Sequence, residues 1–587
     1  MSDTMDLLRS VKDRTDETEF YTPLPEGYKL GKVKYVAVFG TVMSGLGKGI
    51  FSSSLAKLLK DKGLKVSPIK LEGYLNIDSG TLNPFRHGEV FVLDDGMETD
   101  MDLGTYERML DQNLTRANFT TSGQIFSTVL NKERAGSFLG RDVQMIPHVT
   151  GEVKMRLREL AVQSQADVVF VEVGGTVGDI ENSFFIEAIR ELSYEEGAGA
   201  VICVALTYVL APPALGEQKS KAAQLGIKRL MSFGIHPDII ACRAEQPVGE
   251  KVRQKISVYT NVPVQRVFSM HDLPSIYMLP ELMRQSCIDS EVVQMLGVAR
   301  KVNSSRDAKA AIRWAEYVRK LEEVSGQVTI GVTGKYTSLR DSYASIIKAL
   351  EHAGAANDVH VDIEWIDTTD VTDENVADKL ACVDGIIVPG GFGVRGTAGK
   401  IACVKHAREN KLPYLGICLG FQAAVIEYAR NVCGLADANS TELDPDCEYP
   451  VIDILPEQKK IEGLGGNMRL GGQDVELTPG TAAAELFGRT RIRERFRHRY
   501  EVDPKFIDAL TAGGLVFSGR HPAHPIMQIL ELPRDVHPFF MGAQFHPELT
   551  SRPLRPQPMF VGLVAAAIAQ YVTDKKHAEA NRNEKNG

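Results

Sequence analysis

Residues 40–49 read GTVMSGLGKG, and this glycine-rich stretch follows the apolar run 33–39. The pattern predicts a strand, a tight turn and a helix that begins near Lys48. Backbone N–H groups at a helix N-terminus attract phosphate, and the Lys48 ammonium can bridge phosphate oxygens. The strict P-loop spacing is absent, because seven residues separate Gly40 from Lys48 and Gly49 replaces the usual hydroxyl residue. We predict a variant phosphate-binding loop; a structural glycine turn with an exposed lysine is the alternative.

The composition around this loop is that of a globular protein with several domains. The chain has 587 residues, of which 43% are hydrophobic and 24% charged, and its formal net charge is −9. This length predicts at least two domains, each with its own core. The acidic balance argues against nucleic acid as a partner, because phosphate backbones bind clustered Lys and Arg.

No stretch has the pattern of a membrane span or a secretion signal. The apolar runs 198–206 and 561–569 fall short of the roughly 20 residues that a bilayer span needs. The first 20 residues are mixed in charge and lack an apolar core. The eight cysteines show no C-x-x-C spacing, which disfavours zinc sites and disulfide frameworks. We expect a cytoplasmic protein without membrane contact, in which most thiols are buried and reduced.

Strand and helix patterns alternate along both halves of the chain, which predicts two α/β domains, the first of them with a mostly parallel sheet. A charged helical stretch ending in Ser325-Gly326 separates the halves, and we interpret it as a linker. The predicted parts are an N-terminal extension, a first domain, the linker, a second domain and a disordered tail, at residues 1–32, 33–297, 298–326, 327–573 and 574–587.

Two acidic features are candidates for holding Mg²⁺ beside the phosphate loop. The run DDGMETDMD at residues 94–102 crowds five acids into nine positions, and the apolar strand 168–172 ends in Glu172 before a glycine turn. Mg²⁺ prefers one or two carboxylates together with phosphate oxygens and water. We predict Asp102 and Glu172 as ligands; a solvated acidic loop and a strand-end cap are the alternatives.

A pair of lysines stands at another predicted helix start. Residues 217–224 read EQKSKAAQ and place Lys219 and Lys221 two positions apart. These lysines could bind a triphosphate, with Arg253 and Lys255 adding charge. A solvated helix face is the alternative.

A second set of residues in the C-terminal half indicates thiol chemistry. GICLG at residues 416–420 lies between a predicted strand and helix and matches the nucleophile elbow G-x-S-x-G with cysteine for serine. The turn lifts Cys418 above the sheet, and the helix N-terminus favours its thiolate. His546 and Glu548 of QFHPE face the same side of a predicted strand, so that Glu548 can orient and polarise the imidazole.

An oxyanion hole completes this second constellation. PGGFG at residues 389–393 ends a predicted strand and can present the Gly391 N–H, with the Leu419 N–H as the second donor. We predict attack of a thiolate on an amide carbonyl; a buried cysteine, a lone histidine and a glycine loop without a joint role are the alternative.

From about residue 33 to residue 570 the chain resembles the CTP synthase family. The resemblance rests on the stretches SGLGKG, NPFRHGEVFVLDDGMETDMDLGTYER, VEVGGTVGDIE, PGGFGVRG, GICLG, NSTE, RHRYEV and QFHPE in this order. It implies a P-loop NTPase-like, Rossmann-like synthetase domain followed by a class I glutamine amidotransferase domain. It also implies a ligase of pyrimidine biosynthesis that forms a C–N bond. ATP would phosphorylate uracil O4 of UTP, and ammonia, released from glutamine through a Cys418 thioester and channelled between the domains, would displace the phosphate.

The resemblance further implies roles for individual residues. Lys48 and Lys70 would act at the transferred phosphoryl group, His87 and Val90 would gate ammonia, and Asp179 to Glu181 would lie where CTP inhibits. The nucleotide-binding positions would be Ser44, Gly45, Leu46, Gly47, Lys48, Gly49, Ile50, Asp102, Asp179, Ile180, Glu181, Lys219, Ser220, Lys221, Ala222, Ala223, Gln224, Lys255, His271, Asp272 and Leu273. The glutamine-binding positions would be Gly391, Leu419, Gly420, Phe421, Gln422, Glu442 and Arg499.

Ligands and assembly follow from the same resemblance. It implies Mg²⁺, ATP as co-substrate, GTP as allosteric activator, CTP as feedback inhibitor, and a homotetramer that filaments could extend.

Two segments depart from the family's usual pattern. KTKPTQ appears as KSKAAQ at residues 219–224, and K-x-D-P-Y appears as KLEGY at residues 70–74. The charges remain, so we expect changed nucleotide affinity and feedback rather than a changed reaction. Two other functions stay open: another glutamine-dependent ATP amidoligase acting on a carboxylate, and a scaffold or filament subunit that has lost catalysis.

Overall fold

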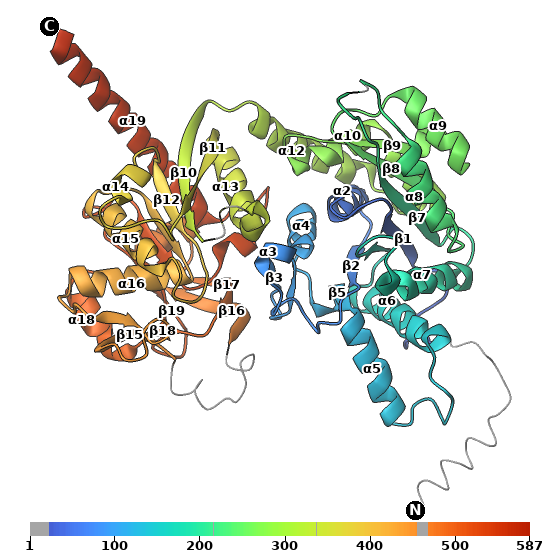
Figure 1. The fold of residues 1–587 in the computed structure, drawn as a ribbon, viewed down its shortest axis with the longest axis horizontal. Coiled ribbons are helices and arrows are strands. Elements are labelled where there is room, and N and C mark those ends of the chain that lie inside the picture. The colour runs from blue at the N-terminus through green and yellow to red at the C-terminus, as the bar shows by residue number, and fades with distance from the viewer. Residues whose placement is uncertain (1–22, 215, 336, 338, 455–467, 587) are drawn as a thin grey trace, which may run out of the picture. The chain divides into compact units, whose positions relative to one another are not determined.

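The computed structural model describes residues 23–214, 216–335, 337, 339–454 and 468–586 (Figure 1). The chain divides into a first unit of residues 1–81 and 105–315 and a second unit of residues 82–104 and 316–587. Most of the predicted N-terminal extension, residues 1–22, lies outside the described residues. No helix in the described ranges is long and apolar enough to cross a bilayer.

The first unit is built on a seven-stranded sheet of order β5-β2-β6-β1-β7-β8-β9, in which every neighbouring pair is parallel. Its central strands are nearly continuous apolar runs, as a sheet buried on both faces requires. This confirms the predicted parallel α/β class. The strands are β1 (Lys34–Gly40), β2 (Val66–Glu72), β5 (Phe119–Thr121), β6 (Val168–Val173), β7 (Val201–Tyr208), β8 (Ile239–Ala244) and β9 (Val267–His271).

Helices flank this sheet and connect its strands (Figure 1). They are α2 (Lys48–Asp61), α5 (Ser122–Arg134), α6 (Thr150–Ser164), α7 (Ser183–Glu196), α8 (Lys221–Met231), α9 (Glu250–Thr260), α10 (Leu279–Gln285) and α11 (Ile288–Met295), with the 3₁₀ turn η3 (Ile180–Asn182) before α7. Helix α4 (Met101–Leu110) and helix α12 (Ser304–Glu322) each span a boundary between the units. Helix α12 therefore forms most of the stretch predicted as a linker.

The second unit has a nine-stranded mixed sheet of order β11-β10-β12-β13-β21-β20-β19-β16-β17. Pairing is parallel from β11 to β21 and antiparallel from β21 to β17. The strands are β10 (Gly326–Gly334), β11 (Val359–Asp367), β12 (Gly385–Val388), β13 (Tyr414–Ile417), β16 (Arg469–Leu477), β17 (Arg491–His498), β19 (Val516–Arg520), β20 (Met527–Glu531) and β21 (Phe540–Ala543). A smaller sheet holds β14 (Ala438–Ser440), β15 (Tyr449–Asp453) and β18 (Glu501–Val502).

Helices of the second unit adjoin the two segments that carry the predicted thiol site. They are α13 (Ala344–Asn357), α14 (Val376–Lys379), α15 (Thr397–Glu409), α16 (Leu419–Asn431), α17 (Ala482–Phe487), α18 (Ile507–Ala512) and α19 (Pro558–Asn586). Helix α16 begins directly after β13, and helix α15 follows the loop after β12. Helix α19 continues through the segment that the sequence analysis treated as a tail.

Residues 82–104 pack within the second unit, although the sequence analysis placed them in the first domain. They form the short helix α3 (Pro84–His87) and the hairpin of β3 (Val90–Val92) and β4 (Glu98–Asp100). Three arginines at alternate positions on β17 hold the hairpin: Arg493 pairs with Asp94 at 3.0 Å, Arg495 donates to the Val92 carbonyl at 3.0 Å, and Arg497 pairs with Glu98 at 2.7 Å. Because side chains alternate along a strand, these three arginines lie on one face of β17. The contacts depend on β17, so the sequence of residues 82–104 alone could not predict them.

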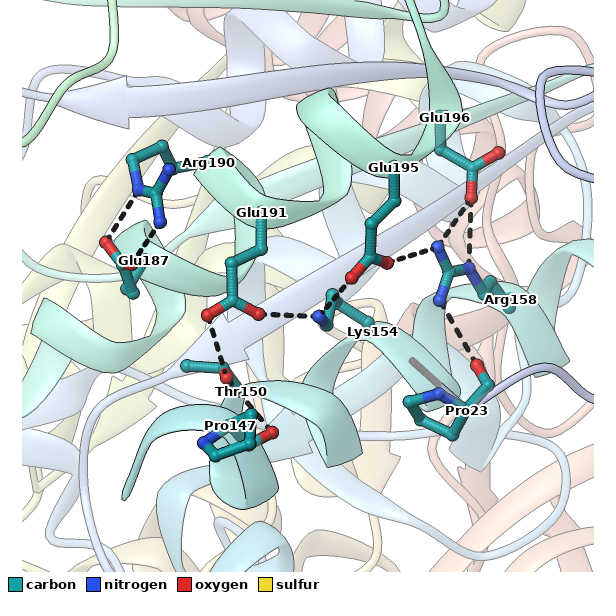
Figure 2. A network of polar contacts seen from close by, with 10 residues as sticks. All are labelled: Pro23, Pro147, Thr150, Lys154, Arg158, Glu187, Arg190, Glu191, Glu195 and Glu196. Carbon is teal, nitrogen blue, oxygen red and sulfur yellow. Dashed lines mark hydrogen bonds and ion pairs between the residues drawn. The ribbon is translucent and has the colours of Figure 1, made fainter. Parts of the chain in front are cut away.

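The described part of the N-terminal extension is tied to the first unit by a buried ion cluster (Figure 2). Arg158 on α6 is fully buried, pairs with Glu195 at 2.7 Å and Glu196 at 2.9 Å on α7, and donates to the Pro23 carbonyl at 3.1 Å. Glu196 also accepts the Gly31 N–H at 2.9 Å. The same guanidinium therefore joins two helices and the incoming chain.

Replacing Arg158 with Met is expected to lower the free energy of unfolding of the first unit by about 3–5 kcal/mol, because the buried Glu196 carboxylate loses its counter-charge, whereas Glu195 keeps its ion pair with Lys154 at 2.6 Å. Arg190→Met is the matched control. It breaks the more exposed Arg190–Glu187 ion pair within α7 and should cost about 0–1 kcal/mol. Urea unfolding followed by Trp314 fluorescence, in a Trp365→Phe background, measures the first unit alone. Equal midpoints for the two variants would contradict the prediction.

Candidate active sites

The predicted strand, glycine turn and helix are present at residues 40–49. Helix α2 begins at Lys48, and Gly45 and Gly47 adopt φ values of 74° and 80°, which favour glycine. The Lys48 Nζ donates to the Gly175 carbonyl at 2.8 Å. A Cβ at Gly40 would lie 3.1 Å from the Lys48 Nζ. The loop therefore presents backbone N–H groups at a helix N-terminus with a lysine folded back over it.

A buried carboxylate lies near the end of β6, the neighbour of β1, and a buried lysine lies opposite it on β2. Lys70 of β2 and Glu172 of β6 are register partners, with Nζ and Oε1 3.7 Å apart, and both side chains are at most 5% exposed. Lys70 also contacts Glu72 at 3.1 Å, and Tyr106 donates to Glu172 at 2.9 Å. Glu172 is three residues from Gly175, the residue that accepts the Lys48 bond. The structure thus brings Lys48, Lys70 and Glu172 to one edge of the sheet.

The second predicted metal ligand, Asp102, belongs to residues 82–104 of the other unit, where its N–H donates to the Asp100 carboxylate at 2.8 Å. Among the described residues no group of three or more His, Cys, Asp or Glu side chains is arranged to hold a metal. A site built from Asp102 and Glu172 therefore stays a prediction.

The altered KLEGY segment contains a close contact that explains its glycine. Asn182, 2% exposed, fills the space beside Gly73, so that a Cβ at Gly73 would lie 2.2 Å from its Oδ1. The same amide is wedged against Gly175, where a Cβ would lie 2.2 Å from Nδ2. The proline usual at position 73 in the family that the sequence resembles therefore cannot fit beside Asn182.

Gly73→Ala is expected to lower the free energy of unfolding of the first unit by about 1–3 kcal/mol, because its Cβ overpacks a side chain that has no room to move. Removing the obstruction in the double variant Gly73→Ala/Asn182→Ala should recover most of this loss. Urea unfolding of the four members of the double-mutant cycle measures the coupling. A double variant as unstable as the sum of the two single variants would refute the packing argument.

The end of β9, where the predicted nucleotide-binding residues His271 to Leu273 begin, lies beside the phosphate loop. Arg243 pairs with Asp272 at 2.6 Å, and its NH1 lies 3.9 Å from where a Cβ at Gly47 would be. His271 is the last residue of β9, and Leu273 follows Asp272. After the carboxyl end of β6, at the same edge of the sheet, the Thr176 N–H donates to Asp179 at 2.6 Å, next to the 85% exposed Ile180 and to Glu181.

The KSKAAQ segment starts a helix, as predicted. Helix α8 begins at Lys221, whose Nζ lies 5.6 Å from the centre of the Tyr259 ring, and Lys219 pairs with Glu217. Ser220 accepts from the Gln224 amide at 3.1 Å, and Ala222 and Ala223 continue the first turn. Lys255 is exposed on α9. These lysines lie at the surface of the first unit, and their binding of a triphosphate stays a prediction.

Cys418 occupies a strained turn between β13 and α16. Its φ of 52° and ψ of −101° are unfavourable for a residue with a Cβ, and its N–H donates to the Ala543 carbonyl at 2.7 Å. A Cβ at Gly420 would lie 1.9 Å from the Val388 carbonyl oxygen, so the elbow needs glycine there. The predicted nucleophile elbow is therefore formed, with Cys418 5% exposed.

His546 and Glu548 form the expected pair, but not through strand geometry. The His546 Nδ1 and Glu548 Oε1 lie 2.7 Å apart. Strand β21 ends at Ala543, and the pair is made by a 3₁₀ turn at Pro547–Thr550, so the prediction that they share one face of a strand was wrong. Burial alone would lower the pKa of His546, but the charges of Glu548 and Cys418 outweigh it and raise the pKa to about 10. His546 therefore carries a proton at neutral pH.

The loop after β12 lies directly against this pair. A Cβ at Gly390 would lie 3.0 Å from His546 Cε1 and 3.5 Å from Cys418 Cβ. The next residue, Gly391, lies beside Leu419, whose Cδ2 would be 3.5 Å from a Cβ at Gly391. The residues that carry the two predicted oxyanion donors therefore lie next to each other, and their action as donors stays a prediction.

The predicted glutamine-binding residues are largely engaged with the backbone of the site. Glu442 accepts the Gly393 N–H at 2.9 Å, and the Gln422 amide donates to the Tyr500 carbonyl at 3.0 Å. Leu419, Gly420 and Phe421 are buried in the first turn of α16, and Arg499 is half-buried after β17. His87 ends α3 and Val90 begins β3, both in the 82–104 segment.

Three contacts of this site escaped the sequence analysis. Cys418 Sγ lies 3.7 Å from the Arg497 carbonyl oxygen and accepts from the Gln544 amide at the same distance. Arg497 also pairs with Glu98 of the hairpin. A single residue, Arg497, therefore contacts both the hairpin and Cys418. The third is Lys400, which lies at the same helical face as Cys403, Val404 and Ala407, a spacing of three, four and seven that marks a buried position.

Lys400 is 2% exposed and donates from Nζ to the Pro389 carbonyl at 2.6 Å and the Gly390 carbonyl at 3.4 Å. Burial and the charge of Lys335 lower the pKa of Lys400 to about 7. Lys335 lies on the outer side of the same loop and donates to the Phe392 carbonyl.

Comparison with known proteins gives matches over both units. Residues 34–298 match the family model for the CTP synthase N-terminus, and residues 338–566 match that for class-I glutamine amidotransferase. CTP synthase of Thermococcus gammatolerans is 49% identical over 91% of this chain and 98% of its own length. The enzyme of Methanopyrus kandleri is 47% identical over 92% and 99%, and that of Clostridium acetobutylicum 46% over 91% and 99%. A solved structure of the Trypanosoma brucei CTPS glutaminase domain with bound acivicin covers 41% of this chain at 37% identity, with a TM-score of 0.39.

Proposed function

The chain belongs to the CTP synthase family, and from this premise we propose that it aminates UTP to CTP with ATP and glutamine, releasing ammonia at Cys418 and consuming it in the first unit. The observation that carries the division is that one chain holds both a strained, buried thiol near the His546–Glu548 pair and a phosphate loop with Lys48. The two alternatives are not favoured, because the match extends over 98% of the relatives' length.

Glutamine hydrolysis begins when the Cys418 sulfur attacks the side-chain amide carbon. The carbonyl oxygen becomes an oxyanion that accepts from the N–H groups of Gly391 and Leu419, and protonated His546 gives its proton to the leaving nitrogen. Ammonia departs and a thioester remains. Water then attacks the thioester with His546, oriented by Glu548, as base, and glutamate and the free thiol are released.

UTP is activated in the first unit before it meets ammonia. The γ-phosphoryl group of ATP passes to uracil O4, with Lys48 and Lys70 stabilising its charge, and ADP leaves. Ammonia adds at C4, the C4–O4 bond breaks so that phosphate leaves carrying the former O4, and the nitrogen loses a proton to give CTP. Activation is needed because an unmodified carbonyl oxygen is a poor leaving group. We assign the gating of ammonia to His87 and Val90 in the 82–104 segment of the second unit.

The residues near the phosphate loop fit a divalent cation. Glu172 supplies a buried carboxylate at a strand end three residues from the loop contact, which suits the hard oxygen ligands that Mg²⁺ prefers. Glu172 and Asp102 would hold Mg²⁺, which would neutralise the ATP phosphates. We also assign to this chain activation by GTP, feedback by CTP, assembly as a homotetramer and a place in the cytoplasm, all on the basis of its family.

An assay of CTP formation with purified protein, UTP, ATP, Mg²⁺ and either glutamine or ammonium chloride tests the proposal, with and without GTP. We expect CTP from both nitrogen sources and stimulation by GTP of the glutamine-dependent rate alone. Omission of Mg²⁺ with chelator should stop both. Turnover of a carboxylate acceptor but not of UTP would establish the other amidoligase reaction instead, and ATP hydrolysis with no acceptor product would refute both.

A further inference from the structure

The Pro389–Gly393 loop has two adjacent glycines at the point where it must present an N–H group to the substrate. Glycine backbones rotate freely because they lack a Cβ, so the Gly390–Gly391 peptide gains little from its own local preference. A carbonyl facing the thiol would repel an oxyanion instead of binding it. Something outside the loop must therefore set the direction of this peptide.

Lys400 is the side chain that contacts these peptides from behind. Its Nζ donates to the Pro389 and Gly390 carbonyls, at 2.6 Å and 3.4 Å, and can do so as an amine or as an ammonium. In the described part of the chain Lys400 makes no ion pair, and the charged group that acts on it most is another lysine. Burying an amine without a carboxylate is costly, so this position is poorly explained by stability alone.

The geometry of a trans peptide converts these contacts into a direction for the N–H groups. The carbonyl and the following N–H lie in one plane and point opposite ways. With the Gly390 carbonyl held toward Lys400, the Gly391 N–H points away from Lys400. Gly390 itself lies against His546 and Cys418, which places the reacting groups beside this loop.

The Phe392–Gly393 peptide of the loop is held in the same way. Lys335 holds its carbonyl, and Glu442 holds its N–H. Side chains therefore set the orientation of the peptides on either side of the Gly391–Phe392 peptide. Lys400 is the one that acts on the peptide next to the thiol.

We propose that Lys400 is a positioning residue for glutamine hydrolysis, holding the Pro389 and Gly390 carbonyls so that the Gly391 N–H faces the oxyanion that forms at Cys418. This inference rests on the glutaminase activity proposed above.

The test uses the full chain with Lys400→Met, which keeps the length of the side chain but donates no hydrogen bond, and Lys400→Gln, which keeps an amide donor. Lys405→Met on the same helix is the matched control. Glutamine hydrolysis is measured with ATP, UTP and GTP present. Two probes separate positioning from damage. L-Glutamate γ-semialdehyde adds to the thiol and forms an oxyanion, whereas iodoacetamide alkylates the thiol without forming one.

We expect Lys400→Met to lower kcat for glutamine hydrolysis by about 10- to 100-fold with KM changed by less than roughly threefold, as loss of an interaction made in the transition state requires. The semialdehyde inhibition constant should rise by a similar factor. Alkylation of Cys418, followed by peptide mass spectrometry, and CTP formation from ammonia should stay near the level of the unchanged protein. The kcat of Lys400→Gln should lie between those of Lys400→Met and the unchanged protein. The kcat of Lys405→Met should match that of the unchanged protein.

The proposal is overturned if kcat is unchanged, if the semialdehyde binds as before, or if alkylation falls as far as hydrolysis, because the last result means that the site has collapsed. Should Lys400→Met fail to fold, the same readings on Lys400→Gln decide. Absence of glutamine hydrolysis by the unchanged protein would refute the proposed function and not this assignment.

Discussion

Cys418→Ala is expected to abolish CTP formation from glutamine while CTP formation from ammonium chloride continues at nearly the unchanged rate. The thiol is the only atom in the proposed mechanism that bonds to glutamine, so its loss should cost roughly 10³-fold or more in kcat for hydrolysis. Ammonia supplied from solution bypasses this step, because phosphorylation of UTP and attack at C4 take place in the first unit. A spectrophotometric CTP assay with each nitrogen source measures both rates.

Cys403→Ala is the control for this experiment. Cys403 is also a buried cysteine of the second unit, but burial raises the pKa of its thiol to about 12, which leaves it unreactive near neutral pH. Its replacement should change neither rate by more than roughly twofold, as a small core truncation that removes no reacting group would. Loss of the ammonia-dependent rate in Cys418→Ala would contradict the division of the reaction between two sites.

Lys48→Ala is expected to stop CTP formation from both nitrogen sources. Its ammonium lies at the start of α2, where it can stabilise the phosphoryl group in transfer, and removal of such a charge should cost roughly 10²-fold or more. Glutamine binding should be unaffected, because every residue assigned to it belongs to the second unit. The same CTP assay, together with release of labelled phosphate from ATP, measures the effect.

The result for Lys48 is read against Lys309→Ala, which removes an exposed lysine from α12 and should leave both rates unchanged. CTP formation from ammonia by Lys48→Ala at more than about a tenth of the normal rate would mean that another group handles the phosphoryl transfer. In that event Lys70, whose ammonium contacts Glu172, becomes the principal candidate.

Features that depend on neighbours in the chain were predictable. The strand, glycine turn and helix at residues 40–49 follow from apolar spacing and from glycines whose φ is positive in the structure. The same holds for GICLG, where the tight turn and the helix start are set within five residues. The α/β class of both units followed from the alternation of patterns, but the antiparallel half of the second sheet did not, and the motifs together identified the family.

Other features were predicted only in part: the sequence pointed to the right residues but not to the geometry or the partners that they have in the structure. His546 and Glu548 were paired by a strand argument, yet Pro547 ends the extended backbone and a 3₁₀ turn brings the two side chains together. Gly73 was noted as a departure from the family's pattern, but its partner Asn182, more than a hundred residues away, was not visible.

The chain therefore encodes its strand–turn–helix units, its nucleophile and its phosphate loop in short stretches, because backbone preference and hydrophobic period act over a few residues. Folding decided what no such stretch contains: that residues 82–104 join the second unit through alternate arginines of β17, that Arg158 ties Pro23 to two helices, and that Lys400 reaches the carbonyls behind the oxyanion loop. Each of these is a contact between distant segments, whose formation depends on complementary shape and charge across the whole core.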